Sequence, residues 1–167
     1  MLESVRDSAR DLVERAAAKG QLGSVVERTA LESVARETRG CIPLWYIDLL
    51  CEVPLAGLVL GWQAYEPDEE WDGVSWMEWS NAQHMRAECL EAYPGIAILQ
   101  RGYVSVALDL DGGGDPYFIP TDQGEDPPLY QVFHDLGDHP DTILEHGRHL
   151  VAPSLSGFFR TAMIEQA

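Results

Sequence analysis

In the middle of the chain, apolar residues recur at every second position, which is the period of strands that bury one face. Between residues 95 and 133 the apolar positions of this pattern are Ile96, Ile98, Val104, Val106, Leu108, Tyr117, Ile119, Tyr130 and Val132. Turn-forming glycines and prolines separate the segments, since glycine accepts positive φ and proline cannot donate to a ladder. The pattern predicts three or four consecutive antiparallel strands with one packed face and one carboxylate-rich face.

Helical spacing dominates on both sides of this region, and each predicted helix has a start or stop signal in the sequence. In chain order the signals are Gly20, the capping box of Ser24 and Glu27, Pro43, the capping box of Ser80 and Gln83, and Ser154. Short strands are predicted near residues 58–62 and from Trp76, and a polar connection between His134 and His149. Helices, a strand, a helix, several strands and a helix follow one another, which indicates an α+β fold.

The distribution of charge changes this picture more than its total. The net charge is −17, yet residues 1–39 hold seven acidic and seven basic side chains. Residues 40–167 hold the other 21 acids against four arginines, so the whole excess belongs to this part. Such a field repels nucleic-acid phosphates and anionic membranes and attracts a basic surface. Keeping the protein soluble is the other explanation that the charge allows.

Three features bear on the compartment. No apolar run approaches the ~20 residues of a membrane span, and the first 20 residues are too charged for a signal peptide. Cys41, Cys51 and Cys89 form no CxxC pair and lie in apolar contexts, so we expect buried free thiols. These features lead us to expect a cytoplasmic protein.

The first candidate contact is an acidic loop with aromatic residues around it. Trp and Tyr are frequent among the residues that dominate binding energies, and carboxylates around them would suit a basic partner. The predicted partner-binding residues of this region are Tyr65, Glu66, Asp68, Glu69, Glu70, Trp71, Asp72 and Trp76, with Trp79 as a further aromatic anchor. A second acidic group, Asp109, Asp111 and Asp115, surrounds the glycine-rich turn. The alternative is a solvated loop whose tryptophans fold back onto the core.

Metal and catalytic signatures are weak. The turn at 109–115 fails the EF-hand pattern, since Gly113 and Pro120 stand where oxygen ligands are required. His134, His139, His146 and His149 match no zinc-site spacing, so we expect no metal and no cofactor. No nucleophile stands beside a base, and no phosphate-binding loop is present, so we expect no catalytic residues.

An ordered series of short features gives the sequence a family resemblance. In chain order they are Ile42-Pro43 before a helix, the strand and capped helix of residues 77–92, the break Tyr93-Pro94-Gly95, Gly102, the strand ending Leu108-Asp109-Leu110, Asp115-Pro116-Tyr117, Gln131-Val132-Phe133, and residues 151–155 leading into Phe158-Phe159. This order resembles the SUKH superfamily, which unites regulators of yeast cell-wall synthesis with many bacterial immunity proteins. The resemblance covers roughly residues 24–165.

The resemblance implies a twisted antiparallel sheet of about four to six strands backed by helices. Residues 24–167 would form a single domain of this kind, and residues 1–23 a helical extension. It also implies a non-enzymatic protein that binds a toxin domain of the nuclease or deaminase type. A regulatory or scaffold module that binds a cellular protein is the alternative, and a small hydrolase that uses paired carboxylates is a third.

Overall fold

The computed structural model describes the backbone of residues 2–166 and the side chains of residues 5–166. The helices are α1 (Leu2–Ala18), α2 (Arg28–Glu37), α3 (Leu44–Glu52), α4 (Ala82–Leu90), α5 (Gly95–Ile98), a 3-10 turn (Leu99–Arg101), α6 (Pro140–His146) and α7 (Leu155–Thr161). The strands are β1 (Val59–Gln63), β2 (Val74–Trp79), β3 (Tyr103–Asp109), β4 (Tyr117–Pro120), β5 (Leu129–Val132), β6 (Arg148–Ala152) and β7 (Met163–Ile164).

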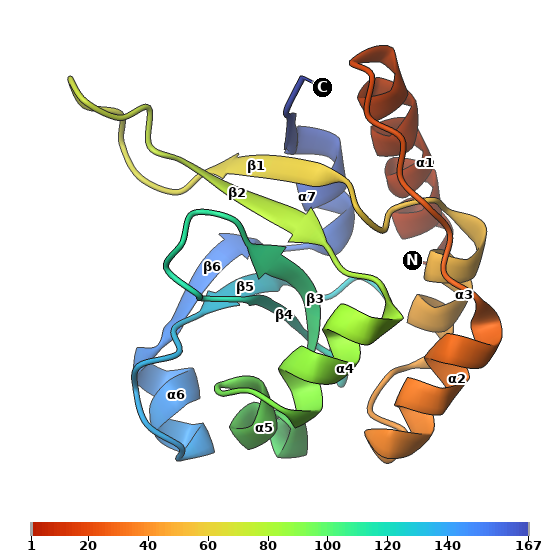
Figure 1. Cartoon of the computed structure of the whole chain (residues 1–167), viewed down its shortest axis with the longest axis vertical. Coiled ribbons are helices and arrows are strands. Elements are labelled where there is room, and N and C mark those ends of the chain that lie inside the picture. Colours follow the sequence, from red (N-terminus) through yellow and green to blue (C-terminus); the bar gives the residue numbers. More distant parts are fainter. Residues whose placement is uncertain (1, 167) are drawn as a thin grey trace.

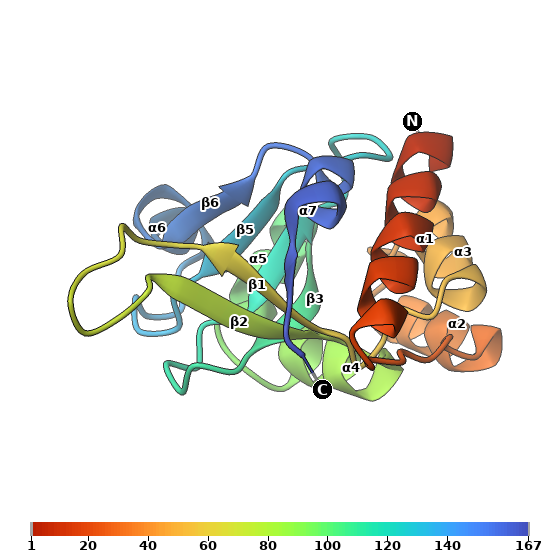
Figure 2. The same ribbon diagram turned by 90° about the horizontal axis from the view of Figure 1, so that it is seen from above.

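These strands form one curled sheet in the order β6-β5-β4-β3-β2-β1-β7, and every neighbouring pair is antiparallel. Helices lie on both sides of it, with α4, α5 and α6 on one side and α7 on the other (Figures 1 and 2). The predicted α+β fold is therefore confirmed. The sheet has seven strands within the described residues, slightly more than the four to six expected.

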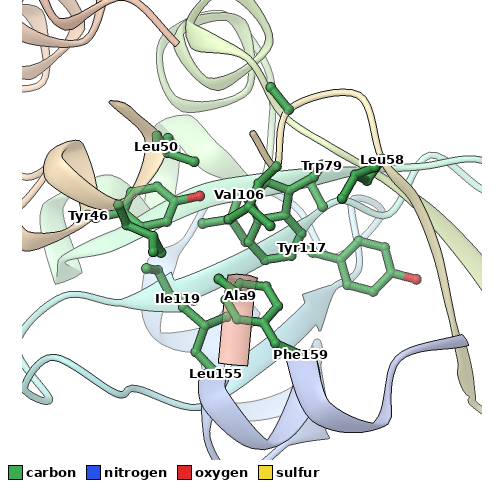
Figure 3. Packing of buried hydrophobic residues seen from close by; sticks show 14 of the residues in the cluster. Ala9, Tyr46, Leu50, Leu58, Trp79, Val106, Tyr117, Ile119, Leu155 and Phe159 are labelled. Carbon is green, nitrogen blue, oxygen red and sulfur yellow. The ribbon is translucent and has the colours of Figure 1, made fainter. Parts of the chain in front are cut away.

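The main core fills the concave side of the sheet. Trp79 of β2 is fully buried and contacts the rings of Phe158 and Phe159, with centroid distances of 6.1 and 5.2 Å. Side chains from α1, α3, α7 and the sheet converge around this group (Figure 3). Trp79 is therefore part of the core, and its expected role as a binding anchor is wrong.

The helix of the predicted N-terminal extension belongs to the same core. Among the described side chains of α1, Val5, Ala9, Leu12 and Ala16 are fully buried in this core. The Arg15 guanidinium donates to the carbonyl oxygens of Phe159 and Ala162, at 2.5 and 3.1 Å, and so satisfies the end of α7. Helix α1 is thereby fixed along α7 by both apolar packing and hydrogen bonds.

The second face of the sheet is also covered. Under α5 and α6, a smaller core cluster contains Ala97, Ile98, Tyr103, Phe118, Val132 and Ile143. Strands β3 and β4 are therefore buried on both faces along most of their length. The prediction of one packed and one carboxylate-rich face is wrong, because the acids follow the strands into the loops instead of lying along them.

Several local predictions also need correction. Ile96 and Ile98 lie in the short helix α5 and not in a strand, and the predicted polar connection contains both α6 and β6. Ser24 caps no helix, because its backbone pairs with Ala56, and α2 begins after Glu27. Ser80 remains in the sheet region, where its N–H donates to Val106, and Asn81 caps α4 in its place.

Other local predictions are confirmed. Pro43 immediately precedes α3, and the Ser154 hydroxyl accepts a hydrogen bond from Gly157 N–H at the start of α7. The three cysteines are free thiols as expected, but the expected burial holds only for Cys89, because Cys41 and Cys51 are partly exposed. Within residues 2–166, no helix has both the length and the apolar content to cross a membrane.

The aromatic core yields a stability prediction. Phe159→Ala should lower the free energy of unfolding by about 3–5 kcal/mol, since it leaves a cavity beside Trp79. Trp71→Ala is the matched control, because Trp71 is 44% exposed, and it should cost less than about 1 kcal/mol. Urea denaturation measures both values, and equal losses for the two variants would contradict this assignment of the core.

Candidate partner-binding surface

The two acidic groups predicted from the sequence lie in loops on the same side of the molecule. Residues 64–73 connect β1 to β2 and form the projecting loop in Figure 1. Residues 110–116 connect β3 to β4, and Figure 2 places this turn on the same side as the β1–β2 loop. The antiparallel meander explains the arrangement, because every second connection of such a sheet leaves from the same end.

The neck of the β1–β2 loop is closed by hydrogen bonds. The Gln63 side-chain amide donates to the carbonyl oxygens of Tyr65 and Asp72, both at 2.7 Å. Gly73 accepts hydrogen bonds at its carbonyl oxygen from the N–H groups of Ala64 and Tyr65. A Cβ at Gly73 would lie 2.2 Å from the Tyr65 oxygen, and its φ of +77° favours glycine. The two ends of the loop are thus held together.

The tip of the loop is ordered by one carboxylate. Asp68 Oδ1 accepts hydrogen bonds from the N–H groups of Glu70 and Trp71, at 2.8 and 2.9 Å. Asp68 N–H in turn donates to the Trp71 carbonyl oxygen at 2.9 Å. The hydrogen bonds from Glu70 and Trp71 lower the pKa of the Asp68 carboxyl. The Asp68 carboxylate therefore has a structural role at the tip of the loop.

This framework presents two exposed aromatic rings. Tyr65 and Trp71 are 54% and 44% exposed, and their ring centroids lie 5.6 Å apart. The ring centroid of Tyr65 lies 6.0 Å from that of His149 in β6, and the ring centroid of His149 lies 5.1 Å from that of Trp62 in β1. Trp62 is buried and donates its indole N–H to the Tyr117 hydroxyl at 3.0 Å. The exposed pair is thereby anchored to the sheet.

The acids of the β1–β2 loop surround this pair. Within the described residues, Glu66, Glu69 and Glu70 have no side-chain hydrogen bond or ion pair, and all three are exposed. Residues 64–73 include no Lys or Arg. The structure therefore brings seven of the predicted residues together in one ordered loop, with Tyr65 and Trp71 exposed beside three free carboxylates.

The predicted acids around the β3–β4 loop accept hydrogen bonds from backbone N–H groups of the protein itself. Asp109 accepts from the N–H groups of Asp111 and Gly114, and Asp111 accepts from Trp76 N–H at 3.0 Å. Asp115 Oδ1 accepts from His134 N–H at 3.0 Å. These three carboxylates fix the turn and join it to β2 and to the segment after β5. Trp76, the remaining predicted residue, lies over Gly61 of β1, where a Cβ would come within 2.8 Å of its ring.

Within the described residues, the acidic and histidine side chains form no metal site, and the hydroxyl groups of Ser156 and Tyr117 have structural roles. Among residues 2–166, no group of three or more His, Cys, Asp or Glu side chains is arranged to hold a metal ion. Ser156 donates to Asp126 in a pair that fixes the start of α7, and Ser156 is buried. Burial raises the pKa of the Tyr117 hydroxyl, which keeps that hydroxyl protonated.

Sequence reasoning missed two residues that build the surface and the structural role of a third. Gln63 closes the loop and His149 links Tyr65 to Trp62, whereas Asp68, expected as a contact residue, orders the tip of the loop. The dipeptide Pro67-Asp68 is a typical turn signal and could have revealed the role of Asp68. The roles of Gln63 and His149 depend on contacts across the sheet that no local pattern contains.

Comparison of the chain with protein-family models, with curated proteins and with solved structures gives no match.

The contact between His134 and Asp115 yields a pH prediction. His134 Nδ1 lies 2.6 Å from Asp115 Oδ1, and this hydrogen bond raises the pKa of His134 above its ordinary 6.5. Because the pKa of His134 is higher in the folded protein than in the unfolded chain, its contact with Asp115 stabilises the fold fully at pH values below the unfolded pKa. This stabilisation is lost as pH rises through the folded pKa. NMR titration of the His134 ring should give a midpoint above 6.5, and Asp115→Asn should lower it. An unchanged midpoint in Asp115→Asn would contradict the assignment.

Proposed function

We propose that this chain is a non-enzymatic binding protein that neutralises a basic toxin domain, of the nuclease or deaminase type, through the β1–β2 loop. One observation carries the proposal: an ordered loop exposes the Tyr65–Trp71 ring pair among carboxylates that have no partner within the described residues. The toxin class comes from the resemblance to SUKH immunity proteins.

The order of the loop favours binding over mere solvation. A loop held by Gln63 and Asp68 loses little conformational entropy when a partner docks, so more of the contact energy appears as affinity. Tyr65 and Trp71 offer large contact area with few rotatable bonds, which is typical of residues that dominate interface energies. An exposed ring pair on a fixed loop is therefore suited to serve as an anchor.

Charge determines which kind of partner fits. An enzyme that acts on nucleic acid presents basic groups to phosphates. The surface around Tyr65 and Trp71 carries negative charge without a neighbouring Lys or Arg in the loop, so it is complementary to such a cleft. Long-range attraction also raises the association rate, which suits an inhibitor that must act quickly in the cytoplasm.

A capture experiment tests the function. The purified protein is used as bait against lysate from its source, and each captured protein is assayed for nuclease and deaminase activity with and without added chain. The proposal predicts a basic enzyme whose activity falls to background at a one-to-one ratio. If the only specific partners are regulatory or cell-envelope proteins without such activity, the chain is a regulatory module instead.

The loop itself is tested by substitution. Replacing Glu69, Glu70 and Trp71 together with alanine should weaken binding of the captured enzyme by about 3 kcal/mol or more, roughly a hundredfold in Kd. The control is Asp11→Ala with Glu14→Ala on α1, which removes the same charge from two exposed positions. Calorimetry measures both affinities. Equal affinities for the triple variant and the wild type, with both folded, would exclude this loop as the contact.

A further inference from the structure

The sheet has a free edge beside the proposed binding loop. Among residues 2–166, strand β6 is the last strand of the sheet and pairs only with β5. Its residues alternate in exposure, and Leu150 is 49% exposed. A strand edge of this kind offers unpaired N–H and C=O groups to any extended chain that lies beside it.

The ladder shows which backbone groups are free. Phe133 N–H donates to the Gly147 carbonyl oxygen at 2.7 Å, just before β6 begins. In antiparallel pairs, residues alternate between those that bond to the partner and those that point away from it. Gln131 and His149 are therefore the next bonded pair, and the N–H and C=O groups of Arg148 and Leu150 point outward. The Val132 N–H follows this alternation, because it points away from β6 and donates to the Pro116 carbonyl oxygen.

A groove lies next to this edge. It has a volume of about 250 Å³ and is lined mainly by Trp62 of β1, Val151 of β6, Phe158 of α7 and Met163 of β7. It exists because the sheet curls until β1 faces β6, while β7 pairs with only Leu60 and Gly61 of β1. An apolar side chain can enter this groove from a chain that runs along β6.

We infer that an extended segment of the basic partner pairs with the free edge of β6, so that this segment adds to the sheet as an eighth strand. The basic charge of the partner comes from the proposed function, on which the inference therefore rests. The extended conformation of the segment comes from the free edge of β6. Side chains two residues apart in such a segment face the same side of the sheet. One apolar residue would enter the groove beside Val151, and a Lys or Arg two residues away would face His149 and the carboxylates of the β1–β2 loop. The segment is therefore recognised by its backbone, one apolar residue and one basic residue.

Peptide titration tests the edge without the natural partner. The probe is an acetylated and amidated eight-residue peptide in which Leu and Arg stand two positions apart and Val and Thr fill the others. The expected result is a downfield NMR shift of the Arg148 and Leu150 amide protons, with smaller changes at His149 and Val151. Shifts confined to residues 64–73 would show that the peptide binds by charge alone and would overturn the inference.

A pair of methylated peptides controls for side-chain effects. Methylating the peptide nitrogen that faces β6 should weaken binding about tenfold, because main-chain hydrogen bonds are lost. Methylating the next nitrogen, which faces away from β6, should leave the affinity within about threefold. Equal weakening by both modifications would contradict strand addition.

Substitution in the protein supplies an independent test. Leu150→Pro removes an N–H that points away from β5, so the sheet should tolerate it, as proline is accepted at strand edges. It should weaken peptide binding about tenfold, whereas Leu150→Ala, which keeps the N–H, should change it by less than about threefold. Circular dichroism verifies the fold. If Leu150→Pro does not fold, Thr161→Trp fills the groove from an exposed position and should also abolish binding.

The remaining outcomes separate this inference from the proposed function. An inhibited enzyme that is sensitive to the triple loop variant but not to Leu150→Pro would refute the edge and leave the function intact. Peptide pairing along β6 without any inhibited enzyme would support the edge and refute the function. Sedimentation of the free protein identifies a second copy as occupant: a dimer that Leu150→Pro dissociates would overturn pairing with a partner.

Discussion

The curl of the sheet around one aromatic group is the constraint on which the rest of this structure depends. Trp79 lies against Phe158 and Phe159, and the strands bend around these rings so that the core is enclosed. The same bend brings His149 of β6 within 5.1 Å of Trp62 of β1, although four strands separate β6 from β1 in the sheet. The packing of the core thus determines where the surface contacts form.

The surface follows from this geometry. Because His149 touches both Trp62 and Tyr65, the β1–β2 loop stands beside the free edge of β6 and not at a distance from it. The carboxylates then divide into two classes. Asp68 and Asp111 accept backbone hydrogen bonds and shape their loops, whereas acids such as Glu69 and Glu70 are left exposed to solvent. A large negative charge therefore serves two purposes, loop structure and attraction of a basic partner.

The sequence predicts those parts of the fold that depend on neighbouring residues. Alternation predicts β3, β4 and β5, and the predicted α+β class is confirmed. Alternation does not predict strand β6, because Arg148–Ala152 lies at an edge of the sheet, where polar residues interrupt the apolar pattern. Gly95 shows a second limit: a Cβ there would lie 1.7 Å from the Glu88 oxygen, so close packing of α5 on α4 decides the local structure. Of the candidate site, composition identified the β1–β2 loop, but contacts between distant residues built it.

The central claim is that the β1–β2 loop and the adjacent edge of β6 form the binding surface. Hydrogen–deuterium exchange of the protein, alone and saturated with the basic protein it captures, tests this claim most directly. The account predicts slower exchange in residues 64–73 and 148–151 and unchanged exchange in α1 and α2. Protection confined to α1 and α2, with these two segments unaffected, would contradict it.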